Sequence, residues 1–226
     1  MKLFIPIVLV LCIYLSGSVS AELHGKSAII STATDTSAIS FDASDFSSLT
    51  AFTVCINAAS ETTRNYALFS YATSTHHNEM LLWLQNTTDF WVYLGDLQIK
   101  FFIPEMNALL KHICVTWESQ GGEITVWVNG RRSIRKVGGK GRVVKGAGLF
   151  IIGQDQDKVG GGFDKGQSFV GEITDVNMWD RVLKPNEIEL ISQGCYSDGG
   201  NIIDWGSTGF TAMGDVAIED NNDCSI

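Results

Sequence analysis

The oxygen-rich segment at residues 155–167 has the residue types best suited to chemistry. Three carboxylates and two amides flank a glycine triplet there. They are Asp155, Asp157, Asp164, Gln156 and Gln167, with the glycines at residues 160–162. Calcium takes about six to eight hard oxygen ligands in an adaptable shell, and glycines let a loop turn its oxygen atoms inward. The spacing is not that of an EF-hand, so composition alone leaves a calcium site and a solvated acidic loop as equal alternatives.

The first twenty residues have the pattern of a secretory signal peptide. Lys2 precedes an apolar run over residues 3–15, and small polar residues follow. That run is shorter than the roughly 20 residues that a membrane-spanning helix needs, and no second run of that length follows. We therefore expect residues 1–20 to be removed, and residues 21–226 to form one extracellular domain without a transmembrane segment.

Cysteine content and net charge further restrict the class of protein and its partners. Cys12 lies in the expected signal peptide, which leaves an even number of cysteines in a disulfide-permissive compartment. The sequence has 25 acidic and 16 basic residues, a formal net charge of −9. This balance argues against nucleic acid as the main partner, because a phosphate backbone attracts basic proteins. A local basic cluster over residues 131–145 is interpreted as a solvated hairpin flank, in preference to a polyanion site.

Short runs rich in β-branched and aromatic residues predict an all-β fold. They cover residues 51–57, 80–85, 90–94, 111–119, 123–129, 149–153 and 169–179. Asn129 and Gly130 predict a type I′ hairpin turn, and Pro185 and Gly194 delimit one short helix. Because the turn signals are regular and no βαβ alternation occurs, we expect a two-sheet antiparallel jelly-roll, or lectin-like, sandwich.

Residues 112–119, HICVTWES, match the pentraxin signature His-x-Cys-x-Ser/Thr-Trp-x-Ser/Thr at each fixed position. Further blocks similar to those of pentraxins follow the family's order. They are residues 52–55, 68–73, 153–157 and 171–180. The chain therefore resembles the pentraxin family up to Trp205, after which the resemblance weakens. His112 and Trp117 should lie on opposite faces of one strand, and we expect packing roles for both.

The resemblance implies a disulfide between Cys55 and Cys114. Cys195 and Cys224 then remain, either to pair with each other or to cross-link subunits.

The resemblance also implies two adjacent calcium ions per subunit, which share two of the carboxylates. The implied ligand positions are Asn78, Asp155, the Gln156 carbonyl, Asp157, Asp164 and Gln167, with His77 where the family has an aspartate. Imidazole is a poor calcium ligand, so His77 predicts that one site is weaker than the other. A transition-metal site at His76, His77 and Glu79 is a less favoured alternative to a solvated histidine pair.

In pentraxins an anionic group of phosphocholine, phosphoethanolamine or a cyclic sugar acetal binds on the paired ions beside an apolar pocket. The matching pocket positions are Leu81, Trp83 and Tyr93, although Tyr93 also suits the sandwich core. Gln98 replaces the acid that holds the choline nitrogen, which predicts weaker phosphocholine binding. Asn86 begins a glycosylation sequon next to this pocket.

Together with these features, the resemblance implies a secreted, calcium-dependent pattern-recognition lectin of innate, acute-phase immunity, assembled as a homopentamer. Its partners would be phosphorylated head groups or carbohydrates on microbial or damaged-cell surfaces. The alternative is a laminin-G-like extracellular adhesion module with purely structural calcium. An enzyme is not expected. A glycosidase needs two carboxylates about 5–9.5 Å apart, and Glu172 and Asp175 would point to opposite faces of a regular strand.

Overall fold

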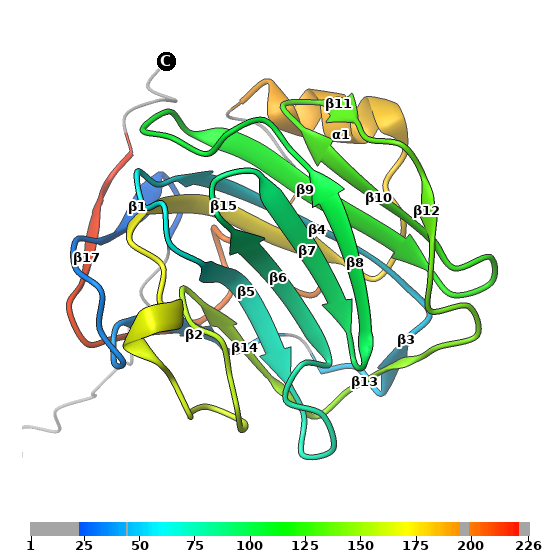
Figure 1. Ribbon diagram of the computed structural model, residues 1–226, viewed down its shortest axis with the longest axis horizontal. Helices are drawn as coiled ribbons and strands as arrows, with labels where there is room; N and C mark the ends of the chain where they lie inside the picture. The colour runs from blue at the N-terminus through cyan, green and yellow to red at the C-terminus, as the bar shows by residue number, and fades with distance from the viewer. Residues whose placement is uncertain (1–22, 44, 195–198, 222–226) are drawn as a thin grey trace, which may run out of the picture.

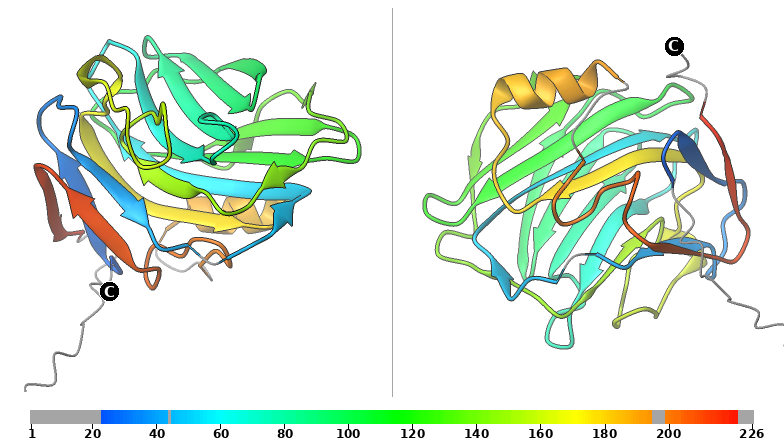
Figure 2. Two further views of the ribbon diagram at one scale, coloured as in Figure 1. Left: turned by 90° about the horizontal axis from the view of Figure 1, so that it is seen from below. Right: turned by 180° about the vertical axis from the view of Figure 1, so that it is seen from behind.

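The computed structural model describes residues 23–43, 45–194 and 199–221. The expected signal peptide at residues 1–20, as well as Cys195 and Cys224, lie outside the described residues. Two antiparallel sheets face each other, and one helix lies outside one of them (Figures 1 and 2). The prediction of a two-sheet antiparallel jelly-roll with one short helix is confirmed. No helix among the described residues is both long enough and apolar enough to cross a membrane.

The sheet on the helix side is called sheet A here. Its strand order is β11 (Arg131–Arg132), β10 (Glu123–Val128), β9 (Lys111–Glu118), β4 (Ala51–Ala59), β15 (Gly171–Trp179), β1 (Lys26–Ile30) and β17 (Val216–Asp220), and β12 (Lys136–Val137) also pairs with β10.

The opposite sheet is called sheet B. Its order is β16 (Phe210–Met213), β2 (Ala38–Phe41), β14 (Leu149–Ile152), β5 (Tyr66–Ala72), β6 (Met80–Gln85), β7 (Asp89–Leu94) and β8 (Leu97–Phe102). A two-stranded ribbon joins β3 (Ser48–Leu49) to β13 (Val144–Lys145). Every strand that the sequence predicted is present, with ends shifted by at most two residues.

The core between the sheets follows from period-two alternation along the strands. On β4, Phe52, Val54 and Ile56 face inward, and Phe52 packs on Trp117 with ring centroids 5.6 Å apart. Between them, Cys55 projects from the outer face of sheet A. Each strand therefore contributes to two different environments.

Helix α1 (Pro185–Ser192) covers the outer face of sheet A, as the rear view of Figure 2 shows. Ile188 of the helix is fully buried in a second apolar cluster that also contains Trp127 and Trp179. The helix begins at the predicted Pro185, where the Lys184 amide donates to the Glu187 carboxylate (2.7 Å) and so satisfies one unpaired N–H. It ends just before Gly194, as predicted.

The hairpin at Asn129 and Gly130 is also confirmed. Their φ angles are 48° and 74°, and Val128 pairs directly with Arg131 across the turn. Positive φ at both central positions is what a type I′ turn requires.

The chain beyond Trp205 contains two strands that the sequence did not predict. There β16 pairs with β2 of sheet B and β17 pairs with β1 of sheet A. Both strands are sheet edges with largely exposed side chains, so their hydrophobic alternation is weak. That is why the sequence pattern did not reveal them.

Candidate functional site

The oxygen-rich loop leaves β14 and lies over the outer face of β5. Gln156 is fully buried and fixes this course, because its Nε2 donates to Ser70 Oγ (3.1 Å) and Leu149 O (2.9 Å). Its Oε1 accepts from the Gly160 amide (2.8 Å). The Gln156 side chain is thus committed to holding the loop, and its main-chain carbonyl is the group that the expected calcium role would use.

Several of the expected ligand atoms are oxygens that are buried and lack a hydrogen-bond partner among the described residues. They are Asn78 Oδ1, Asp155 Oδ1 and Gln167 Oε1. Buried polar atoms are usually paired, and unpaired ones also occur elsewhere among the described residues, as at Gln154 Oε1; here three of them are acceptors at expected ligand positions. All three accept and do not donate, which is the donor set that calcium prefers. The donor chemistry of these residues therefore fits a calcium ion.

Burial and charge make Asp155 the most perturbed acid of the loop. Its residue is 7% exposed. Burial and, second to it, the negative charge of Asp157 raise the pKa of Asp155 to about 6, while the Gln156 N–H and His77 act in the opposite direction. A cation beside Asp155 and Asp157 would offset both the desolvation and the repulsion.

The remaining acids of the loop are open to solvent. Asp157 and Asp164 are exposed. Asp164 Oδ1 accepts from the Gly166 amide (2.8 Å), which orients its carboxylate at the start of the 3-10 turn η1 (Lys165–Gln167). Gly162 passes so close to Asp157 that a Cβ on it would lie 2.7 Å from the aspartate Cβ, and its φ is +78°. Glycine at this position therefore permits the loop to close around Asp157.

The turn between β5 and β6 carries Asn78 and is held by two contacts. The Asn78 carbonyl accepts from the Gly95 amide (2.8 Å). The next residue, Glu79, is fully buried and its carboxylate accepts from Arg142 Nη2 (2.9 Å) and from the Lys145 amide (2.8 Å). Because both carboxylate oxygens of Glu79 already accept these hydrogen bonds, the structure argues against the alternative metal site at His76, His77 and Glu79.

Arg142 was missed by the sequence interpretation, which treated residues 131–145 as a solvated flank. That interpretation is right for Arg131 and Arg132, which are exposed on β11. It is wrong for Arg142, whose guanidinium forms the buried ion pair with Glu79. The two residues are 63 positions apart, so no local pattern pairs them.

The expected ligand pocket lies on the outer face of sheet B. Strand pairing sets Leu81, Tyr93 and Gln98 side by side, because Leu81 is opposite Tyr93 and Tyr93 is opposite Gln98. We call this set the ligand row. Trp83 is two residues further along β6, and so on the same face. Tyr93 is not part of the core between the sheets, and Asp155 is close enough to raise the pKa of its hydroxyl, after the larger effect of burial.

Trp91 was not among the expected pocket residues, although the alternation of β7 would have placed it on the same face as Tyr93. The two rings lie 6.5 Å apart. Asn86, the sequon asparagine, is exposed beyond the end of β6, in the turn to β7.

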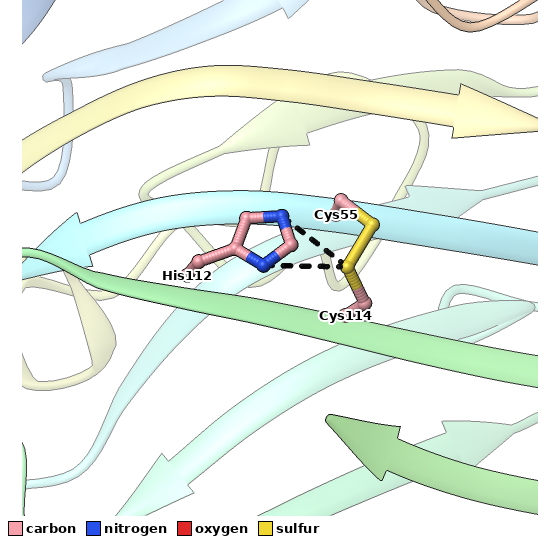
Figure 3. A group of neighbouring side chains, drawn as sticks. All are labelled: Cys55, His112 and Cys114. Carbon is pink, nitrogen blue, oxygen red and sulfur yellow. Dashed lines mark hydrogen bonds between the residues drawn. A yellow bond between two sulfur atoms is a disulfide. The ribbon is translucent and has the colours of Figure 1, made fainter. Parts of the chain in front are cut away.

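The disulfide between Cys55 and Cys114 is present, between directly opposite residues of β4 and β9 whose Cα atoms lie 4.0 Å apart. Figure 3 shows the His112 imidazole beside it, with Nε2 3.4 Å from Cys114 Sγ. This trio has the residue types of a metal site, but both sulfurs are consumed by the disulfide. Burial lowers the pKa of His112 to about 4, so the ring is neutral at pH 7. His112 and Trp117 do lie on opposite faces of β9, in line with the packing roles expected for them.

Glu172 and Asp175 of strand β15 are the two acids that bear on a glycosidase activity. Strand β15 has a register shift between Thr174 and Asn177, and Asp175 in the shift has φ 51°. The Asp175 carboxylate accepts from Asn57 Nδ2 (3.0 Å) on the outer face of sheet A. Glu172 precedes the core residue Ile173, so its side chain points to the outer face of sheet A, as that of Asp175 does. The prediction that the two acids point to opposite faces is therefore wrong, because the strand is irregular at the register shift.

The comparisons with known proteins agree over nearly the whole chain. The model of the Pentaxin family matches residues 27–220. C-reactive protein of Cavia porcellus is 40% identical over 201 residues, 88% of this chain and 88% of that protein. Mucosal pentraxin of Mus musculus is 40% identical over 206 residues, 91% of this chain and 92% of that protein.

Among solved structures, the native heptameric SAP-like pentraxin from Limulus polyphemus superposes with a TM-score of 0.80. It is 23% identical and covers 91% of this chain and 100% of its own, which shows the shared fold. The chain belongs to the Pentaxin family.

Proposed function

We propose that this pentraxin is a secreted, calcium-dependent recognition protein of innate immunity, and not an enzyme. Two calcium ions would be held by the loop at residues 155–167 together with Asn78. The observation that carries the proposal is the set of buried oxygens on Asn78, Asp155 and Gln167 that have no hydrogen-bond partner in the described part of the chain. A calcium ion would give each of them a partner.

The expected ligand residues would be distributed over the two calcium ions. Asp155 and Asp157 would be shared between the ions, Asn78 and the Gln156 carbonyl would complete one site, and Asp164 and Gln167 would complete the other. The His77 side chain is exposed, is close enough to lower the pKa of Asp155, and offers no oxygen ligand. The first site would then be weaker than the second.

The ions would present a positive surface to an anionic group of the ligand. The ligand row would lie next to that group, since Tyr93 is within electrostatic reach of Asp155. Leu81, Trp83 and Tyr93 provide apolar surface, and neutral Gln98 offers a hydrogen bond in place of a charge. This arrangement favours phosphoethanolamine-type or anionic carbohydrate ligands on microbial or damaged-cell surfaces over phosphocholine.

A column experiment tests the proposal. The protein is loaded on immobilised phosphoethanolamine in calcium and should elute with EDTA. Asp155→Asn should abolish retention, whereas Asp215→Asn, an exposed acid in the β16–β17 turn, should not change it. Absence of retention, with calcium still raising the unfolding temperature, would favour the laminin-G-like alternative with structural calcium.

Assembly and processing belong to the same proposal. A homopentamer would display all calcium sites together, so weak single sites would add by multivalency. Native mass spectrometry counts the subunits, and a heptamer, as in the Limulus protein, would contradict the pentamer. The mature protein should begin near residue 21, carry a glycan on Asn86 and contain no free thiol at Cys195 or Cys224.

A further inference from the structure

An aromatic surface continues from the ligand pocket toward the free edge of sheet B. Trp83 on β6 is directly opposite Trp91 on β7, and Trp91 is directly opposite Lys100 on β8. The neighbouring residues Val92 and Ile99 face the core, so these three side chains project from the outer face. They lie on three successive strands, each about 4.8 Å from the next.

A charged pair is built into this surface. Lys100 Nζ bonds the Asp89 carboxylate (2.6 Å) and lies 5.6 Å from the Trp91 ring centroid. It also lies 4.6 Å from the ring of Phe102, which is 77% exposed. We call Trp91, Lys100, Asp89 and Phe102 the outer platform.

We propose that the outer platform is a second ligand subsite, which binds an uncharged sugar ring linked to the anionic group held on calcium. The C–H face of a pyranose packs on an indole ring, and its hydroxyls can accept from Lys100 and donate to Asp89. The inference rests on the proposed function and adds the class of ligand: a glycan chain of at least two units, with the acidic unit at the calcium end.

Continuity and polarity favour a glycan over a protein partner. The outer platform begins where the ligand row ends, with the Trp91 and Tyr93 rings 6.5 Å apart. Its aromatic rings alternate with polar groups, because Lys100 separates Trp91 from Phe102. A protein interface is depleted in charges at its centre, whereas a sugar ring presents apolar faces and hydroxyls at once.

The experiment compares probes of increasing length. Phosphoethanolamine, mannose 6-phosphate and pentamannose 6-phosphate are titrated calorimetrically into the calcium-loaded protein. The variants are Trp91→Ala, Trp91→Tyr and Lys100→Gln, with Leu190→Ala on the far side of the molecule as a control for a lost exposed apolar side chain.

Trp91→Ala should lower the affinity for pentamannose 6-phosphate by about tenfold and leave the affinity for phosphoethanolamine unchanged. Trp91→Tyr should retain most of the affinity, since a ring remains, and Leu190→Ala should change nothing. An equal loss for both probes, or no loss for the pentasaccharide, overturns the subsite.

Two further results are informative. If wild-type protein binds neither phosphoethanolamine nor mannose 6-phosphate in calcium, the proposed function is wrong and the subsite falls with it. The series is repeated in Asn86→Gln, because the sequon lies at the end of the same hairpin. If Trp91→Ala no longer weakens pentamannose 6-phosphate binding in the Asn86→Gln background, the outer platform contacts the protein's own glycan, and the proposal is refuted.

Discussion

The ion pair between Arg142 and Glu79 holds the turn that carries Asn78, and Arg142→Met tests how much it contributes. The Glu79 side chain is 1% exposed and that of Arg142 24% exposed. Breaking a buried pair from one side costs about 3–5 kcal/mol, because a buried charge loses its partner. Glu79 keeps its bond from the Lys145 amide, so the lower end, about 3 kcal/mol, is expected. For a domain of this size that lowers the unfolding temperature by about 6–12 °C.

Thermal unfolding in EDTA measures this loss without a contribution from calcium. Arg135→Met is the matched control, because its pair with Glu123 is exposed and worth at most about 1 kcal/mol. Glu79→Gln in addition to Arg142→Met should recover part of the stability, since no buried charge then remains. Equal losses in the two arginine variants, or strict additivity in the double variant, would refute the reasoning. Calcium affinity should also fall in Arg142→Met and not in Arg135→Met.

Three further predictions concern the metal and ligand site. Since the pKa of Asp155 is raised to about 6, calcium affinity should fall by about tenfold per pH unit below 6. For the same reason, metal-free protein should lose stability as the pH rises from about 4 to 6. Asp155→Asn should flatten this stability profile, and an unchanged slope would contradict the assignment. Gln98→Glu should shift the preference from phosphoethanolamine to phosphocholine in competition assays, because it adds a charge for the quaternary nitrogen; a choline preference in the wild type would oppose the pocket assignment. His77→Asp should strengthen the weaker of two calorimetrically resolved calcium sites, whereas equal affinities in the wild type would mean that another oxygen already completes the shell.

Local rules in the sequence determined much of the fold. Period-two alternation identified β4, β6, β7, β9, β10, β14 and β15, because each of these strands has a strongly apolar face. The turn at Asn129 and Gly130 and the ends of helix α1 followed from backbone preferences of single residues. The signature around Cys114 indicated the family and, through it, the disulfide to Cys55. The edge strands β16 and β17 were missed because half-exposed strands carry little alternation, and β1, β2, β5 and β8 were not among the predicted runs either.

Tertiary structure alone decided how distant residues meet. The shift that turns Asp175 toward Asn57 breaks the alternation on which strand reasoning depends. The Arg142–Glu79 pair and the cross-strand alignment of the ligand row are set by sheet register, which a single sequence does not specify. The sequence supplied oxygen atoms of the kind that calcium prefers at residues 78 and 155–167, but only folding buries three of them without a hydrogen-bond partner among the residues that the structure describes. The physical reason is that burial is a property of the packed chain, whereas donor chemistry is a property of the residue.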